Sequence, residues 1–124
     1  MSWRNEEALR VKPLVERCVS DGKVLGAICD ACRFLASLGA LNSVRHTAND
    51  LEELKALESY TNIQGFVARQ SVSDNGVVTA NGTAPLEFAV DILRALKVAD
   101  ESRVMEWYAF HKLGFYTVPL PKAQ

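Results

Sequence analysis

One short segment, Lys23–Cys29, limits the folds open to this chain more than any other part of the sequence. It reads Lys-Val-Leu-Gly-Ala-Ile-Cys, an apolar run without the polar alternation of a strand that faces water on one side. Such a run is typical of a strand buried on both faces, as in a parallel sheet covered by helices. We therefore predict a buried central strand here, which needs neighbouring strands on both of its edges.

Helical and strand-like patterns alternate along the chain, which predicts the α/β class. Apolar stripes and capping residues predict helices at Asn5–Asp21 with a late start or bend at Pro13, at Asp30–Leu38, after a cap at Asn49 or Asp50, after a cap at Thr83, and between Asp100 and Gly114. Further strands are expected at Ser43–Thr47, Gly65–Ser73 and Val77–Ala80, the last two joined as a hairpin through Asp74-Asn75-Gly76.

The composition restricts the class of protein and its partners. With 124 residues, of which 48% are apolar and 23% charged, the chain suits a single globular domain over residues 1–124. A net charge of −1 argues against binding to nucleic acid or to an anionic membrane surface. The N-terminus has no apolar signal region, and three cysteines are a low, odd number, so we expect a reduced cytoplasmic protein.

The junction that follows the apolar run carries the chemistry. Cys29 lies where the predicted strand breaks straight into a helix, with Ala27 two residues before it and Ala31 two residues after it. This pattern is typical of a nucleophile elbow, a turn so tight that large flanking side chains would clash. The helix N-terminus would stabilise a thiolate, and the Asp30 backbone N–H could point at an oxyanion beside the sulfur. A plain buried cysteine is the alternative reading.

Two other uses of the cysteines stay open. Cys29 and Cys32 form a C-x-x-C pair at a helix start, so a dithiol redox role is possible, although Cys32 would face the helix interior. A zinc site is less favoured, because the other soft ligands, Cys18, His46 and His111, lack paired spacing. We therefore expect neither a metal nor a cofactor.

The remaining polar candidates have structural readings beside any functional one. His46 ends a short predicted strand and could reach the thiol as a base, but a hydrogen-bonded structural histidine is the more common case. Asp50, Glu52 and Glu53 form an acidic first turn that complements a helix dipole, so we assign them no acid–base role.

Several segments resemble one known family. Gly22–Ala31 resembles the "GKxxxAIC" elbow of the ThiJ/PfpI family, which is part of the class I glutamine amidotransferase-like superfamily. Val78–Ala89 resembles that family's closing strand-to-helix passage, "(I/V)TSxGxxxxxEFA". Ser2-Trp3, His46–Asp50 and Glu106–Tyr108 are similar to one bacterial branch of the family. The resemblance covers nearly the whole chain, and the two main motifs occur in the family's order.

The resemblance implies a flavodoxin-like, three-layer αβα sandwich with Cys29 as the elbow nucleophile and the Asp30 N–H as half of an oxyanion hole. The family often has a histidine where this chain has Asn49, whereas His46 comes earlier; with Cys29, both are candidate catalytic residues. It also implies a domain truncated at its N-terminus. The missing part would hold the first strands, the acidic partner of the cysteine and the other oxyanion donor. Family members are intracellular and usually oligomeric.

Three functions therefore stay open. The first is a cysteine hydrolase, amidase or glyoxalase/deglycase-like protein that uses Cys29 on a small-molecule or peptide carbonyl, impaired when the chain is alone. The second is a non-catalytic assembly module, because the apolar strand lacks enough partners; a second copy or a complementing N-terminal half would complete its sheet. The third is a dithiol redox protein that uses Cys29 and Cys32.

Overall fold

The computed structural model describes residues 2–123, and its centre is a three-stranded sheet with the strand order β1-β3-β2. β1 (Leu25–Ile28) runs parallel to β3 (Val77–Ala80), and β2 (Ser71–Asp74) pairs antiparallel with β3. The mixture of one parallel and one antiparallel pair follows from the connections, since a hairpin joins β2 to β3 and a long crossover with helices joins β1 to the hairpin.

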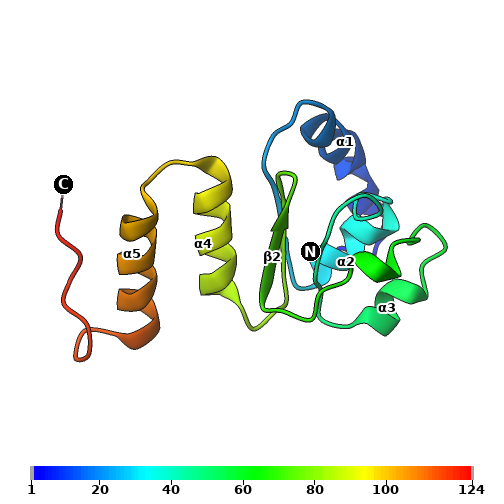
Figure 1. Ribbon diagram of the computed structural model, residues 1–124. Helices are drawn as coiled ribbons and strands as arrows, with labels where there is room; N and C mark the ends of the chain where they lie inside the picture. Colours follow the sequence, from blue (N-terminus) through cyan, green and yellow to red (C-terminus); the bar gives the residue numbers. More distant parts are fainter. Residues whose placement is uncertain (1, 124) are drawn as a thin grey trace.

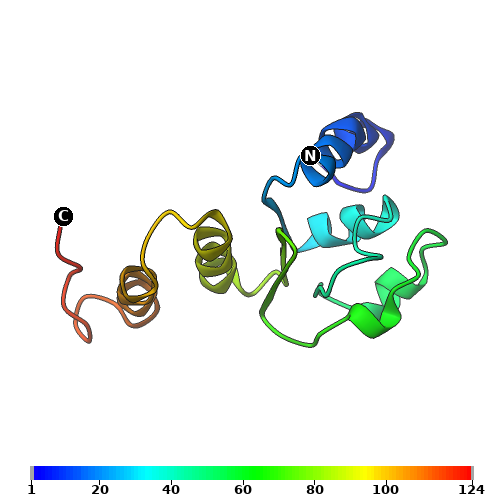
Figure 2. The same cartoon turned by 45° about the horizontal axis from the view of Figure 1, so that its top comes forward.

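Helices lie on both sides of the sheet (Figures 1 and 2). α4 (Pro85–Leu96) packs against β2 and β3 on one side, while α1 (Lys12–Ser20) and α2 (Asp30–Ser37) pack beside β1 on the other. α3 (Leu51–Lys55) lies beside α2, and α5 (Glu101–Leu113) packs against α4 rather than against the sheet. The predicted α/β class and its αβα layering are confirmed.

The first helical region is divided at the place that its proline indicates. A 3-10 helix, η1 (Glu6–Val11), precedes α1, which begins at Lys12 with Pro13 in its first turn. Pro13 is tolerated there because the first N–H groups of a helix have no intrahelical acceptor. The Asn5 side chain accepts a hydrogen bond from the Ala8 N–H at 3.2 Å, which confirms the predicted cap.

The hairpin between β2 and β3 is also confirmed. Its two turn residues, Asn75 and Gly76, both have positive φ angles, 48° and 79°, as a type I′ turn requires. The strand expected from residue 65 begins only at Ser71, because the chain first turns through the 3-10 helix η2 (Ile63–Gly65). The strand expected at 43–47 is reduced to one isolated bridge between His46 and Phe66.

One predicted helix cap lies at the wrong residue, and another, Asp100, is at the N-cap position of α5 but makes no side-chain cap bond. The Thr83 hydroxyl donates to the Asn81 side-chain oxygen at 2.7 Å, and the N-cap position of α4 is Ala84, whose side chain caps nothing. By contrast, the Asp50 side chain accepts from the Glu52 N–H at 2.9 Å and caps α3. Thr83 fails because a nearer partner satisfies its hydroxyl.

The central strand is β3, and the prediction that β1 is buried on both faces is wrong. All four residues of β3 are buried, whereas in β1 only Ala27 is buried and Gly26 is exposed. Within residues 2–123, β1 pairs only with β3, so its outer edge stays open. The core lies between β1, α2 and the segments around α3; its most buried members include Cys32, Phe34, Leu35, Ala36, Leu41 and Leu54.

The C-terminal region extends away from this core (Figure 1). Leu113, Phe115, Tyr116 and Leu120 are exposed there, at the end of α5 and in the tail that follows it. None of the helices in the described part of the chain is both long enough and apolar enough to cross a bilayer.

Candidate functional site

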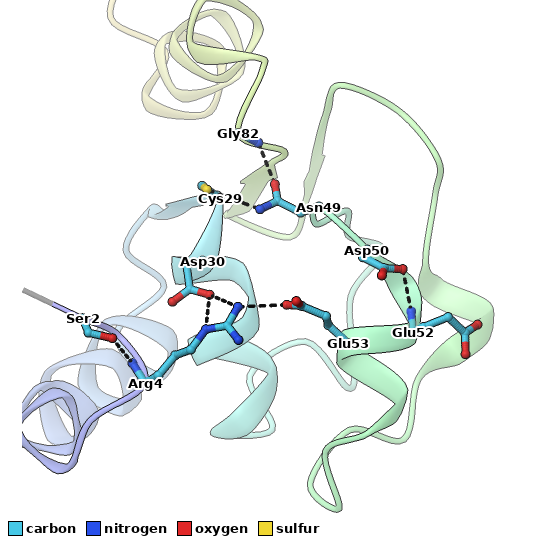
Figure 3. A network of polar contacts seen from close by, with 9 residues as sticks. All are labelled: Ser2, Arg4, Cys29, Asp30, Asn49, Asp50, Glu52, Glu53 and Gly82. Carbon is cyan, nitrogen blue, oxygen red and sulfur yellow. Dashed lines mark hydrogen bonds and ion pairs between the residues drawn. The ribbon is translucent and has the colours of Figure 1, made fainter.

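Cys29 occupies a sharp turn in which β1 ends at Ile28 and α2 begins at Asp30 (Figure 3). Its backbone lies at φ 60° and ψ −130°, a region that costs a residue with a side chain about 1–3 kcal/mol. The Cys29 N–H donates to the Ala80 carbonyl at 3.0 Å and its own carbonyl accepts from the Cys32 N–H at 3.0 Å. These two bonds tie Cys29 to the sheet and to the helix at once, which holds the strained backbone and leaves the residue exposed.

Asn49 and Gly82 lie beside the sulfur. The Asn49 side-chain Nδ2 donates to Cys29 Sγ at 3.3 Å, and its Oδ1 accepts from the Gly82 backbone N–H at 2.8 Å (Figure 3). Asn49 therefore joins the loop after β3 to the thiol. As a site residue, Asn49 was named only through a family position, since the sequence pattern itself offered it as a helix cap. Gly82 was missed as a site residue, although Asn-Gly directly after a strand is a recognisable turn signal.

An ion-pair network lies on the other side of the turn. Arg4 Nε donates to Asp30 Oδ1 at 2.8 Å, and its Nη2 donates to Glu53 Oε2 at 3.0 Å (Figure 3). The bond to Asp30 and the charge of that carboxylate raise the pKa of Arg4 above its usual value. This network neutralises a carboxylate next to the thiol and links the N-terminal segment to α2 and α3. The sequence missed it because the partners are far apart along the chain.

Asp30 also contributes a backbone group to the site. It is the first residue of α2, so its N–H has no acceptor within the helix and is free to bind a ligand oxygen. The positive end of the helix dipole lies at the same place and favours negative charge beside Cys29.

His46 does not lie with Cys29. Its side chain is fully buried; Nδ1–H donates to the Val44 carbonyl at 2.8 Å, and Nε2 lies 2.7 Å from the Tyr60 hydroxyl. Burial is the main cause that lowers the pKa of His46 below its ordinary value, so the ring is neutral at pH 7. With both ring nitrogens occupied, His46 is not available as a base for the thiol, and the geometry favours the structural reading.

Cys32 faces the interior rather than Cys29. Its side chain is fully buried, and Sγ lies 3.3 Å from the carbonyl oxygens of both Ala27 and Ala80. Burial raises the pKa of the Cys32 thiol to about 11, so it is protonated at neutral pH. Because disulfide exchange needs an accessible thiolate, this geometry argues against the dithiol reading. All three cysteines are free, and in residues 2–123 no group of three acidic, cysteine or histidine side chains comes together for a metal.

Two neighbouring hollows lie at this end of the sheet. A small one of about 10 Å³ is lined by Cys29, Asp30 and Asn49 among others. A wider one of about 520 Å³ shares residues 48–50 with it and extends to Arg69 and Asn81. A larger cavity, of about 650 Å³, lies elsewhere, between β2 and the α4–α5 pair. The chemistry is therefore located by the thiol and its contacts, not by cavity size.

Known proteins resemble the chain over most of its length. Residues 2–95 match the model of the DJ-1/PfpI family. The chain is 35% identical over 115 residues to the "Uncharacterized protease YdeA" of Bacillus subtilis, a match that covers 93% of this chain and 58% of that protein. It is 40% identical over 92 residues to the "Uncharacterized protease YoaZ" of the same organism, covering 73% of this chain and 44% of that protein.

Solved structures agree with these sequence relatives. A crystal structure of a ThiJ/PfpI family protein from Bacillus anthracis superimposes with a TM-score of 0.85 at 32% identity, over 90% of this chain and 53% of that chain. A DJ-1 superfamily protein from Agrobacterium tumefaciens gives a TM-score of 0.72 at 36% identity, over 82% and 56%. The chain thus spans about half the length of its relatives and has part of their flavodoxin-like fold. By its family match and these similarities, the chain belongs to the DJ-1/PfpI family.

Proposed function

We propose that this protein is a cysteine-dependent hydrolase of the amidase or protease type, with Cys29 Sγ as its nucleophile. The observation that carries the proposal is the exposed thiol in a strained strand-to-helix turn, with a hydrogen-bond donor from Asn49 on the sulfur. Family membership and the printed names of the two Bacillus subtilis relatives, both called uncharacterized proteases, support the same class.

The proposed reaction has two steps. Cys29 Sγ attacks the carbonyl carbon of an amide or ester, and a C–S bond forms while the C–O π electrons move onto oxygen. The Asp30 N–H stabilises that oxyanion. The oxyanion then collapses, the C–N or C–O bond breaks, and the leaving group takes the proton that the thiol has lost. In the second step water attacks the thioester, which releases a carboxylic acid and restores the thiol.

We expect Cys29 of the chain alone to be acylated faster than the resulting thioester is hydrolysed. Among residues 2–123, the side chain that contacts Sγ is an amide, and His46 is occupied elsewhere, so neither supplies a base for water. Without a positioned general base, about 10²–10⁴-fold of the rate of deacylation is lost. The acyl-enzyme should therefore accumulate.

The test is to trap this acyl-enzyme. The chain is incubated with p-nitrophenyl acetate at pH 7 and its intact mass is measured; an acetyl adduct that peptide mapping assigns to Cys29 is expected. Cys29→Ala should lose the adduct, and Cys18→Ala should keep it. An adduct on Cys18 alone, or none, would refute the hydrolase. A reversible adduct formed only with a 2-oxoaldehyde would indicate the glyoxalase-like alternative instead.

A second proposal concerns assembly, and the open edge of β1 favours it. We propose that β1 pairs with a strand from a polypeptide segment equivalent to the part of the relatives that this chain does not match. Beside this edge lies an apolar groove of about 190 Å³, the β1 groove, which is lined by Trp3, Val11, Leu14, Val15, Cys18, Leu25, Gly26, Ala27, Ala31, Phe34 and Leu35. The chain covers only 58%, 44% and 53% of the lengths of these relatives, which favours such a segment over a second copy.

Sedimentation velocity tests this assembly. The chain is measured alone and with the unmatched part of YdeA supplied as a separate polypeptide. We expect a monomer alone and a 1:1 complex in the mixture, with a change in Trp3 fluorescence as the groove is covered. If the chain alone forms a homodimer that Leu14→Glu dissociates, the partner of β1 is a second copy of the chain and not the proposed segment. A mixture that stays dissociated would overturn the proposal.

A further inference from the structure

We infer that Gly82 and Asn49 form a gate beside Cys29, meaning that they restrict what can approach the sulfur. Gly82 limits the size of the approaching group, and Asn49 presents a hydrogen-bond donor of fixed orientation to the sulfur. This inference rests on the proposed function only in taking the incoming group to be an acyl group. The gate itself is a property of the thiol and its neighbours, so it can be tested without turnover.

Gly82 is needed for space rather than for backbone freedom. Unlike Gly22, Gly39, Gly76 and Gly114, it does not have a positive φ, so its backbone conformation would suit alanine. A β-carbon at Gly82, however, would lie 3.0 Å from Cys29 Sγ and 3.5 Å from Cys29 Cβ. The missing side chain therefore keeps one side of the sulfur open.

The backbone around Gly82 has little freedom to move aside. The Asn81 N–H donates to the Gln70 carbonyl at 3.1 Å, and Asn81 Nδ2 donates to Gln70 Oε1 at 2.7 Å. The Ala84 N–H donates in turn to the Asn81 carbonyl at 3.2 Å. The turn after β3 is thus held on both sides of Gly82. A larger residue at this position would have to displace the Cys29 sulfur or the Asn49 side chain that donates to it.

The orientation of the Asn49 amide is determined by the same turn. Because Oδ1 accepts from the Gly82 N–H, Nδ2 must face Cys29 Sγ, where it can only donate. The segment that carries Asn49 is anchored: the Thr47 N–H donates to Thr79 Oγ1 of β3 at 2.8 Å, and both threonines are buried. Asn49 is therefore a positioning residue that offers a fixed donor to a thiolate, and not a base.

These contacts indicate the substrate class. One side of the sulfur is covered by the Asn49 amide, and on the side next to Gly82 even a single β-carbon would approach the sulfur to 3.0 Å. We infer that an acyl group unbranched at the carbon next to the carbonyl puts the least bulk on this crowded side, whereas a branched one would bring a methyl group toward the turn after β3. We therefore assign the site to unbranched acyl groups, such as acetyl or glycyl.

The first experiment measures alkylation of Cys29 by intact-mass kinetics, with Cys18 in the same molecule as the internal control. Gly82→Ala should slow the reaction of Cys29 with iodoacetamide at least about tenfold, and with the bulkier N-ethylmaleimide more, while Cys18 is unaffected. Equal rates in Gly82→Ala and wild type for both reagents would overturn the size limit. A far-ultraviolet circular dichroism spectrum identical to that of the wild type shows that the variant is folded.

The second experiment compares Asn49→Asp with Asn49→Ala. Aspartate keeps an acceptor for the Gly82 N–H but presents a carboxylate oxygen to the sulfur, so the alkylation of Cys29 at pH 7 should fall about tenfold or more and its pH–rate profile should move to higher pH. Alanine should slow the reaction less and leave the profile nearer that of the wild type. A profile for Asn49→Asp equal to the wild type would overturn the role of Asn49.

The two ideas can fail separately. If p-nitrophenyl acetate gives no adduct but the Gly82 and Asn49 variants behave as expected, the gate stands and the hydrolase is refuted. If the p-nitrophenyl esters of acetate and of the branched pivalate acylate wild-type Cys29 equally fast, relative to their hydroxide-catalysed rates, the hydrolase stands and the assigned substrate class is refuted.

Discussion

The C-terminal end of β1 and its outer edge differ in their bonding partners, although they belong to one strand of four residues. At its end, Cys29 has the backbone bonds to Ala80 and Cys32 and the side-chain bond to Asn49, at 3.0 to 3.3 Å. Along its outer edge, β1 has no partner strand in the described residues, and beside it lies the β1 groove, almost entirely apolar. Bonds within this chain therefore hold the turn that carries the thiol, whereas the outer edge of β1 has no partner strand among residues 2–123.

Each region contains one accessible cysteine, which makes the comparison measurable. Cys29 lies at the polar end of β1 and is exposed, while Cys18 lines the β1 groove and is half-buried. Reagents for thiols can thus report on both regions in one sample.

The largest effect is expected at the sulfur itself. Cys29→Ser should abolish fast alkylation and acyl-enzyme formation, because a serine hydroxyl here has no base to activate it. Mass spectrometry after iodoacetamide treatment should then find label only on Cys18. If a fast-reacting thiol persists in this variant, the reactive sulfur is that of Cys18 in the β1 groove, and the end of β1 is not the reactive region.

The next effect concerns the edge. Leu14→Glu puts a charge into the β1 groove, where the Leu14 side chain is 52% exposed, and should weaken assembly with a complementing segment at least about tenfold. Leu96→Glu is the matched control, since Leu96 is 50% exposed but does not line the groove. Equal binding by both variants, measured by sedimentation, would show that the groove is not the contact surface.

A smaller effect is expected for the buried cysteine. Cys32→Ala removes a fully buried sulfur from the core and should lower the free energy of unfolding by about 1–2 kcal/mol in urea titrations. The alkylation rate of Cys29 should stay within about twofold of wild type, since Cys32 acts by packing. A large loss of Cys29 reactivity with unchanged stability would revive the dithiol reading.

The smallest effect is a pH dependence. The lowered pKa of His46 means that the unfolded chain binds a proton at this ring before the native chain does. Stability is therefore fully present above about pH 6.5, the ordinary pKa of histidine, and falls as the pH drops from there toward the native pKa, by at most about 1.4 kcal/mol per pH unit. His46→Gln should flatten this dependence in urea titrations between pH 7.5 and 5.5. His111→Gln, which changes an exposed ring, should leave it unchanged; equal slopes in all three proteins would contradict the assignment.

The sequence predicted the parts of the fold that local signals determine. The strand that breaks at Cys29, the Asn75-Gly76 turn and the Asn5 cap each depend on a few adjacent residues, and each is present. The same reasoning located the thiol, because a tight turn demands small neighbours at fixed spacing.

Other features depend on residues that are distant along the chain, and there the sequence was insufficient. It took β1 as the buried central strand, but burial depends on which strands pair, and β3 holds that position. It offered His46 as a possible base, but Tyr60, 14 residues away, occupies its ring. The contact of Gly82 with the sulfur joins residues 53 positions apart, and periodicity carries no information about such a pair.

The most direct test of the central claim is the relative reactivity of the two accessible thiols in the native protein. Wild-type chain is treated with a limiting amount of iodoacetamide at pH 7, and the label on each cysteine is quantified by peptide mass spectrometry. The account predicts that Cys29 reacts at least about tenfold faster than Cys18, with Cys32 labelled only in denaturant. Labelling of Cys29 at or below the rate of Cys18 would contradict it.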